Sequence, residues 1–127
     1  MDILVVEDEV TYLRILSSIF TGAGHRVHES TGGYEAMEIL DNHHVDVIVT
    51  DQIMRPVSGL ELVAKVKKRP DLAHISIIII TGDSSLSTMV EAADALVNGY
   101  IVKPFDSSAV LSKLELVISE KQISDEK

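Results

Sequence analysis

The stretch Val45-Asp-Val-Ile-Val-Thr-Asp51 is a nearly continuous run of β-branched residues that ends in an aspartate. A second run, Ile75-Ser-Ile-Ile-Ile-Ile-Thr81, has the same character and ends in a threonine. Such apolar runs are typical of parallel strands that helices cover on both faces. We therefore predict that both runs are central strands of a parallel sheet.

Helical and extended patterns alternate on either side of these two runs. Between the strands, apolar residues recur at three- and four-residue spacing, which indicates amphipathic helices. The predicted strands are 3–6, 26–30, 45–50, 76–80 and 100–102, and the predicted helices are 11–20, 33–42, 59–69, 86–95 and 107–120. Asp8 or Thr11 is expected to cap the first helix. Five alternating βα units predict an α/β fold with a doubly wound, five-stranded parallel sheet.

Length and composition predict one domain with a single core, since the chain has 127 residues of which 46% are apolar. We expect a folded domain over residues 1–120 and a polar C-terminal tail over residues 121–127. The net charge of −9 opposes contact with nucleic acid and with anionic membranes. Because the chain lacks cysteine and any apolar stretch of bilayer length, we expect a cytoplasmic protein. The five histidines are scattered and predict no histidine-containing site.

Polar residues follow four of the predicted strands, at the point where each strand ends. They are Glu7-Asp8, Asp51, Thr81 and Lys103. The carboxyl ends of parallel strands lie along one edge of a sheet, where open α/β folds place their ligands. We therefore expect three acids, a hydroxyl and a lysine to face one another at one site.

These residue types suit phosphoryl transfer. Glu7, Asp8 and Asp51 offer only hard oxygen ligands, which Mg²⁺ prefers. With the carboxylates neutralised, Asp51 on a central strand can act as nucleophile and form an aspartyl phosphate. Lys103 offers a point charge to the phosphoryl oxygens, and Thr81 offers a hydroxyl that must move toward them. Taken singly, each residue favours a plainer interpretation, Asp8 as a helix cap and Lys103 as a solvated loop residue. The arrangement at four separate strand ends favours the site.

The same residues carry a family resemblance. The segments Leu4-Val-Val-Glu-Asp-Glu9, Asp51 with Met54 and Gly59, Thr81-Gly82, and Tyr100-Ile-Val-Lys-Pro-Phe105 resemble the receiver domain of two-component response regulators, of the chemotaxis-receiver kind. Thr81 lies 30 positions after Asp51 and Lys103 lies 52 positions after it, as in that family. The resemblance covers essentially the whole chain. It implies a flavodoxin-like (βα)5 fold with strand order 2-1-3-4-5.

The resemblance also implies roles for the site residues. Asp51 would accept a phosphoryl group from a histidine kinase or a histidine phosphotransfer protein. Glu7, Asp8, Asp51 and the backbone carbonyl of Ile53 would hold Mg²⁺ or Mn²⁺. Thr81 and Lys103 would bind the phosphoryl group. A cis peptide bond between Lys103 and Pro104 would aim the lysine into the site.

By the same resemblance, Thr81 and Tyr100 would form a switch. When Thr81 turns inward, Tyr100 would swing from exposed to buried and remodel the surface of the fourth helix, fifth strand and fifth helix for an output partner. A half-buried strand aromatic is the alternative for Tyr100. The chain would be a signalling phosphoacceptor that catalyses only its own phosphorylation and dephosphorylation, and a monomer or weak dimer.

Three positions depart from the family pattern. Arg55 separates Met54 from Pro56, so the loop beside the acceptor is expected to differ in shape, with Arg55 either over the site as a phosphate or kinase contact or in water. Leu96 stands where the family often has a glycine that ends the fourth helix, so that helix is expected to end differently. Ile53 has no polar group to orient an attacking water, which predicts slow hydrolysis.

Two other functions compete with the receiver. A Mg²⁺-dependent aspartyl-phosphate hydrolase would use the same nucleophile, but it would want a second aspartate where Ile53 stands. A degenerate receiver would keep the fold and act by binding alone. Phosphorylation of the chain by a small phosphodonor distinguishes the three.

Overall fold

The computed structural model describes residues 1–54 and 56–125. These residues form five strands and five helices that alternate along the chain. The strands are β1 (Asp2–Val6), β2 (Arg26–Ser30), β3 (Val47–Asp51), β4 (Ser76–Thr81) and β5 (Gly99–Val102). The helices are α1 (Val10–Gly22), α2 (Gly33–Asn42), α3 (Gly59–Lys68), α4 (Leu86–Asp94) and α5 (Ser107–Asp125). Arg55, for which two positions were predicted, lies outside the described residues.

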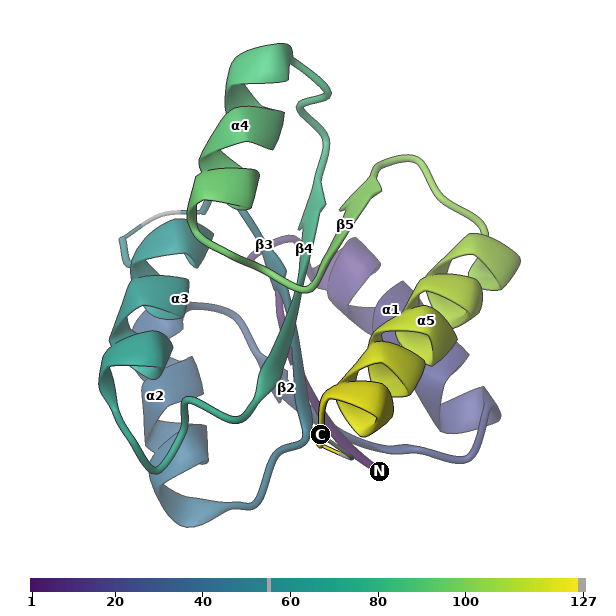
Figure 1. The fold of residues 1–127 in the computed structure, drawn as a ribbon. Coiled ribbons are helices and arrows are strands. Elements are labelled where there is room, and N and C mark those ends of the chain that lie inside the picture. Colours follow the sequence, from purple (N-terminus) through teal and green to yellow (C-terminus); the bar gives the residue numbers. More distant parts are fainter. Residues whose placement is uncertain (55, 126–127) are drawn as a thin grey trace.

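The five strands form one parallel sheet in the order β2-β1-β3-β4-β5, which confirms the predicted fold. Helices α1 and α5 cover one face, and α2 and α3 lie on the other with α4 above them (Figure 1). The strand order reverses between β1 and β3. Ligands of open α/β sheets bind beside such a switch point, outside the carboxyl ends of the strands.

Side-chain alternation along each strand divides the core into two apolar layers. On β1, Ile3 and Val5 pack toward α1 and α5, whereas Leu4 and Val6 pack toward α2 and α3. On β4, Ile78 and Ile80 join the first layer, and Ile77 and Ile79 join the second. Strands with both faces buried need no polar alternation, which explains the continuous apolar runs of β3 and β4.

The predicted helix bounds agree with the structure to within two residues except at the end of α5, and the predicted cap of α1 differs as well. The residue that caps α1 is Glu9, whose side chain makes no capping hydrogen bond, so the prediction of Asp8 or Thr11 is wrong. Helix α5 continues to Asp125, so its predicted end at Glu120 is wrong too. An ion pair between Lys121 and Asp125, one turn apart at 3.6 Å, accompanies the extra turn. The division into a domain and a tail at residue 120 stays a prediction.

Within the described residues, no helix combines the length and apolar character needed to cross a membrane.

Candidate functional site

Three of the predicted site residues converge on one ammonium group. Lys103 Nζ, just beyond β5, donates to Glu7 Oε2 at 3.0 Å and to Asp51 Oδ2 at 3.2 Å. Glu7 follows β1 and Asp51 ends β3, so the parallel sheet brings the three strand ends together. The side chains of all three are at least nine-tenths buried. The peptide bond between Lys103 and Pro104 is cis.

Burial and charge set the protonation of this group. Burial raises the pKa of Glu7 to about 7; the hydrogen bond from Lys103 works against this, and the charge of Asp51 adds to it. Burial alone would lower the pKa of Lys103, but the hydrogen bond to Glu7 and the charge of Asp51 outweigh it and raise that pKa overall. Lys103 therefore stays cationic between two crowded carboxylates.

Asp8 completes a carboxylate cluster beside the lysine. One oxygen each of Glu7, Asp8 and Asp51 lies within 4.8 Å of the others, and Asp8 is exposed to solvent. The donors are all carboxylate oxygens, and they repel one another without a cation. This chemistry fits a small, hard dication that takes carboxylates and keeps other positions for water and substrate.

The chain just after Asp51 is tied to the start of α3, because the N–H of Gly59 donates to the carbonyl of Gln52 at 3.0 Å. Ser58 caps α3 with a capping box, in which its hydroxyl accepts from the N–H of Glu61 at 3.2 Å. The N–H of Ile53 donates to Asp51 Oδ1 at 3.3 Å, while Ile53 as a whole is 59% exposed. One carboxylate oxygen of Asp51 thus faces the backbone of the loop and the other faces Lys103.

Thr81 lies at the end of β4, and its side chain lines an open cavity of about 550 Å³ together with Asp51 and Lys103. Its hydroxyl oxygen accepts the N–H of Asp83 at 3.1 Å. The pKa of Asp83 lies below its usual range, because the N–H of Ser85 and the hydroxyl of Thr88 donate to its carboxylate. An ionised side chain therefore organises the loop that follows Thr81.

Tyr12 belongs to the site, although the sequence analysis missed it. Lys103 Nζ lies 4.2 Å from the centre of the Tyr12 ring, and that ring packs against Phe105 at 5.9 Å. A cation over an aromatic face is attracted by the ring quadrupole. No motif in the sequence signals Tyr12, because the contact depends on how α1 lies against the loop after β5.

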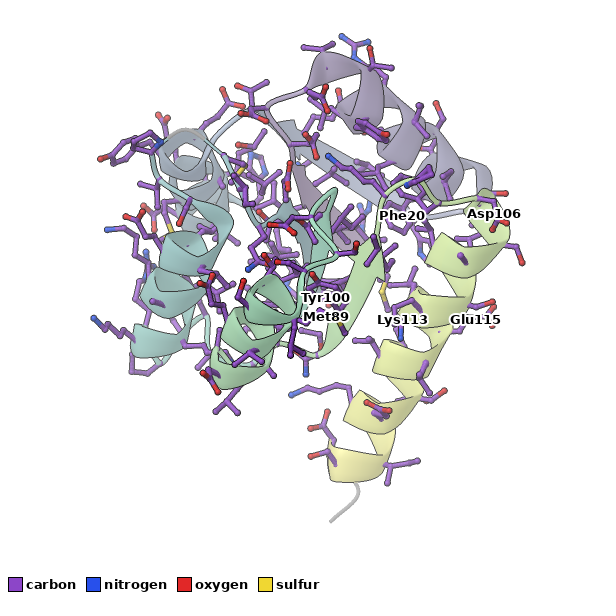
Figure 2. All side chains as sticks on the ribbon, turned by 90° about the horizontal axis from the view of Figure 1, so that it is seen from above. Phe20, Met89, Tyr100, Asp106, Lys113 and Glu115 are labelled. Carbon is purple, nitrogen blue, oxygen red and sulfur yellow. The ribbon has the colours of Figure 1, made fainter. Side chains whose placement is uncertain are left out.

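Tyr100 lies outside this cluster. Its hydroxyl donates to the backbone carbonyl of Asp83 at 3.2 Å, and its ring is only partly buried. Figure 2 shows Tyr100 and Met89 near each other between α4 and β5, where both line a cavity of about 280 Å³. The structure therefore connects Tyr100 to the loop after Thr81 through one hydrogen bond.

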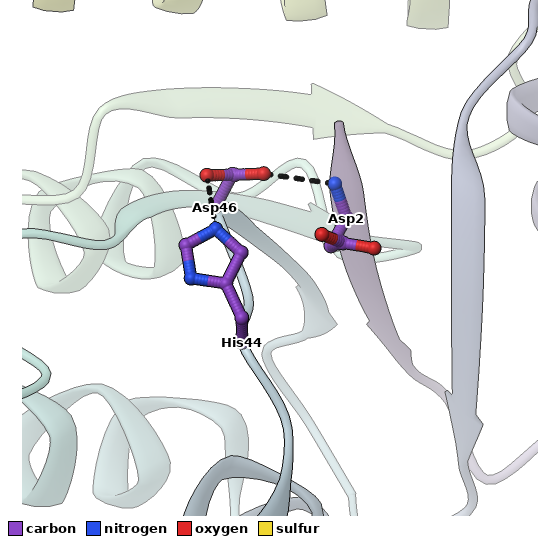
Figure 3. Close-up of side chains that lie close together, drawn as sticks. All are labelled: Asp2, His44 and Asp46. Atoms are coloured by element: carbon purple, nitrogen blue, oxygen red, sulfur yellow. Dashed lines mark hydrogen bonds and ion pairs between the residues drawn. The ribbon is translucent and has the colours of Figure 1, made fainter.

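A second polar cluster lies at the opposite ends of the strands. Asp2, His44 and Asp46 come within 4.8 Å of one another (Figure 3), although the sequence predicted no histidine site. Asp46 accepts the N–H of Asp2 at 2.8 Å and pairs with His44 at 2.9 Å, while the Asp2 carboxylate pairs with Arg26. These polar groups pair with one another and with Arg26, and we assign the cluster a structural role where β1 and β3 begin.

Comparisons with known proteins agree with this geometry. The family model of the response regulator receiver domain matches residues 3–115. A chemotaxis protein CheY homolog of Campylobacter jejuni is 39% identical over 120 residues, which cover 93% of this chain and 92% of the relative. Chemotaxis protein CheY-3 of Vibrio cholerae is 33% identical over 118 residues, which cover 92% and 91%.

Solved structures show the same architecture. The response regulator receiver domain protein (CheY-like) from Methanospirillum hungatei JF-1 superposes with a TM-score of 0.86 at 26% identity, and the match covers 97% of both chains. Sequence and structure thus agree over nearly the full length, and the chain belongs to the response regulator receiver domain family.

Proposed function

We propose that this receiver accepts a phosphoryl group on Asp51 from a histidine kinase or a histidine phosphotransfer protein. The observation that carries the proposal is the position of Lys103 Nζ, 3.2 Å from Asp51 Oδ2 and 3.0 Å from Glu7 Oε2. A cation held there balances the charge that phosphoryl oxygens bring when they join Asp51.

In the proposed transfer, a carboxylate oxygen of Asp51 attacks phosphorus and forms the new P–O bond. The P–N bond of the donor's phosphohistidine breaks, and its electron pair stays on the imidazole nitrogen. The backbone N–H of Ile53 holds Oδ1 of Asp51, which orients the carboxylate. Lys103 would then lie close enough to bind the phosphoryl oxygens of the aspartyl phosphate.

Glu7, Asp8 and Asp51 would hold a Mg²⁺ or Mn²⁺ ion, together with the backbone carbonyl of Ile53. When bound, the dication neutralises the carboxylates and polarises the phosphoryl oxygens. Asp8 is the exposed member of the set, so the ion would meet solvent on its side.

The response to phosphorylation would begin at Thr81. Its hydroxyl would leave the N–H of Asp83 and donate to the phosphoryl oxygens, which shifts the loop that also holds the Tyr100 hydroxyl. The population of conformations would then shift toward a state in which Tyr100 and the surface of α4, β5 and α5 bind an output partner. The phosphoryl group supplies the differential binding energy between the two states.

As a signalling module, the protein would catalyse its own phosphorylation and dephosphorylation and no metabolic reaction. We place it in the cytoplasm as a monomer or weak dimer that acts through protein contacts. Its net charge of −9 opposes direct contact with nucleic acid.

The test is incubation with acetyl phosphate and Mg²⁺, followed by intact mass spectrometry of the wild type and Asp51→Asn. We expect one added phosphoryl group on the wild type and none on the variant. No gain on the wild type, or an equal gain on Asp51→Asn, would favour a receiver that acts by binding alone. Continuous release of phosphate without an adduct would instead favour the hydrolase.

A further inference from the structure

Gln52 directly follows the phosphoacceptor and is almost fully buried, with 3% of its surface exposed. Its backbone is fixed on both sides, because its N–H donates to the carbonyl of Ile80 at 3.1 Å and its carbonyl accepts the N–H of Gly59 at 3.0 Å. The Gln52 side chain therefore leaves from a rigid point at the junction of β3, β4 and α3.

The Gln52 side chain reaches across to the first turn of α4. Its Nε2 donates to the backbone carbonyl of Thr88 at 3.1 Å. A carbonyl can only accept, so the nitrogen end of the amide must face Thr88. Among the residues that the structure describes, Oε1 of Gln52 accepts no hydrogen bond.

Thr88 is also tied to the loop after Thr81. Its hydroxyl donates to Asp83 Oδ2 at 2.8 Å, and the N–H of Asp83 donates to the Thr81 hydroxyl at 3.1 Å. A continuous path of contacts thus leaves the site through Gln52, crosses the first turn of α4 at Thr88, and returns to the site through Asp83. Energetic coupling between sites travels through packed and hydrogen-bonded networks of this kind when they have two arrangements.

We propose that Gln52 is a positioning residue that holds the first turn of α4 to the phosphoacceptor strand, so that α4 responds to the charge state of Asp51. The proposal deepens the phosphoacceptor function and rests on it. When the Thr81 hydroxyl leaves the N–H of Asp83 for the phosphoryl group, it frees Asp83 to shift, and with it Thr88, whose hydroxyl donates to Asp83. The Gln52 amide then fixes the pivot about which the first turn of α4 shifts, because Gln52 itself is anchored to β4 and α3.

Two variants remove the N–H donor in different ways. Gln52→Met keeps a long, unbranched side chain without polar atoms, and Gln52→Glu keeps the shape but presents oxygens to the Thr88 carbonyl. Gln122→Met, on the exposed side of α5, is the matched control. Each protein is measured with and without acetyl phosphate and Mg²⁺ by intact mass, by thermal unfolding, and by hydrogen exchange of the amides of residues 86–92.

In the wild type and Gln122→Met, we expect phosphorylation to change the exchange rates of residues 86–92. Without phosphorylation, we expect those amides to exchange about fivefold faster in the two Gln52 variants than in the wild type. This factor corresponds to the loss of one hydrogen bond of ordinary net strength, about 1 kcal/mol. The change on phosphorylation is expected to disappear in both variants. The unfolding midpoint of Gln52→Met is expected to stay near that of the wild type, since this variant also removes the unpaired Oε1.

The mass and exchange measurements separate the two proposals. Gain of one phosphoryl group by Gln52→Met, with the wild-type exchange response intact, would overturn the role of Gln52 and leave the phosphoacceptor function standing. If no protein gains a phosphoryl group, the phosphoacceptor function is overturned. In that case, amide exchange in the Gln52 variants that equals the wild-type exchange would also overturn the positioning role. Faster exchange confined to residues 86–92 would support the hold of Gln52 on the first turn of α4. If Gln52→Glu does not fold, Gln52→Met alone decides.

Discussion

At the scale of single residues, Lys103 is the centre of the site. It contacts two buried carboxylates and an aromatic face, and only 8% of its side chain is exposed. A buried charge is tolerated when it is paired, and removal of one partner leaves the others uncompensated. The position of the Lys103 ammonium therefore depends on all three neighbours, so substitution of one neighbour tests its contribution to the site.

Replacement of Tyr12 by Leu should slow phosphorylation of Asp51. The ring holds the ammonium over the site, and a desolvated cation–π contact contributes about 1–2 kcal/mol, so a rate about fivefold to thirtyfold lower is expected. Tyr12→Phe keeps the ring face and is the matched control. The measurement is the rate of mass gain with acetyl phosphate and Mg²⁺, and equal rates for the Leu and Phe variants would contradict the role of the ring.

Replacement of Ile53 by Asn should shorten the lifetime of the phosphoryl group. Ile53 is 59% exposed beside the acceptor, and its side chain offers no polar atom to a water, whereas an amide there can orient a water for attack. General positioning of this kind is expected to accelerate decay by about tenfold or more. The decay of phosphorylated protein after removal of the donor measures it, and equal lifetimes in the two proteins would refute the prediction.

At the scale of elements, α4 is followed by a residue in the left-handed conformation, and that residue is Leu96 instead of a glycine. Leu96 has a φ of 59°, its N–H donates to the carbonyl of Ala93, and the residue is 73% exposed. The helix was expected to end differently because of Leu96. Instead, the leucine adopts the conformation that glycine would adopt most easily.

Leu96→Gly should therefore stabilise the protein by about 1 kcal/mol, because it relieves a side chain in the left-handed region and sacrifices little packing. Leu116→Gly, at a half-exposed position inside α5, should destabilise the protein by about 1 kcal/mol. Urea unfolding of both variants measures the two free energies. Destabilisation by Leu96→Gly would show that this leucine contributes contacts that its exposure does not suggest.

The start of α3 packs directly beneath the phosphoacceptor. A Cβ on Gly59 would collide with the backbone carbonyl of Asp51 and would lie 2.8 Å from Cα of Gln52. Gly22, at the end of α1, has open space at the same position. Glycine is thus required at residue 59 by close approach of two backbones, and at residue 22 it is not.

Gly59→Ala should destabilise the protein by about 2 kcal/mol or more, since the backbone of β3 must shift to make room. Gly22→Ala should be neutral or stabilising by up to about 1 kcal/mol, because alanine favours helix and meets nothing. Thermal or urea unfolding compares the pair. Similar effects of the two substitutions would mean that α3 can move away from β3 at little cost.

At the scale of the whole molecule, the topology decides where the charges meet. Strands β1, β3, β4 and β5 are parallel and adjacent, so residues far apart in the sequence reach the same edge of the sheet. The resulting concentration of carboxylates opposes folding unless a cation offsets it. Lys103 supplies one positive charge. The three carboxylates whose oxygens lie within 4.8 Å of one another can therefore be offset further by a bound cation.

Mg²⁺ should therefore stabilise the folded protein, by about 2.7 kcal/mol at a concentration 100-fold above its dissociation constant. Asp8→Asn should lose most of this gain while leaving the metal-free protein as stable as the wild type or more so, because Asp8 is exposed and its charge repels its neighbours. Glu9→Gln removes the adjacent exposed carboxylate, which is not one of the three clustered acids, and should keep the gain. Unfolding temperatures with Mg²⁺ and with EDTA provide the measurement; a full Mg²⁺ gain in Asp8→Asn would exclude this cluster as the binding site.

The types and order of the elements could be predicted from the sequence. The apolar runs of β3 and β4 and the helical spacing between strands report burial directly, because each element must present its apolar side to the core. Helix ends were less predictable. Glu9 precedes the first residue of α1 and makes no side-chain capping hydrogen bond. Helix α5 extends through a polar segment in which Lys121 pairs with Asp125.

The sequence by itself determined a parallel sheet and the reactive groups at its carboxyl edge, because strand-forming runs and the polar residues that end them are local features. Only the tertiary structure decided which groups touch. It placed Tyr12 under Lys103 and joined Gln52 to Thr88, contacts that depend on how helices from distant parts of the chain dock against the strands. Such docking is set by packing over the whole core, and no local pattern of residues records it.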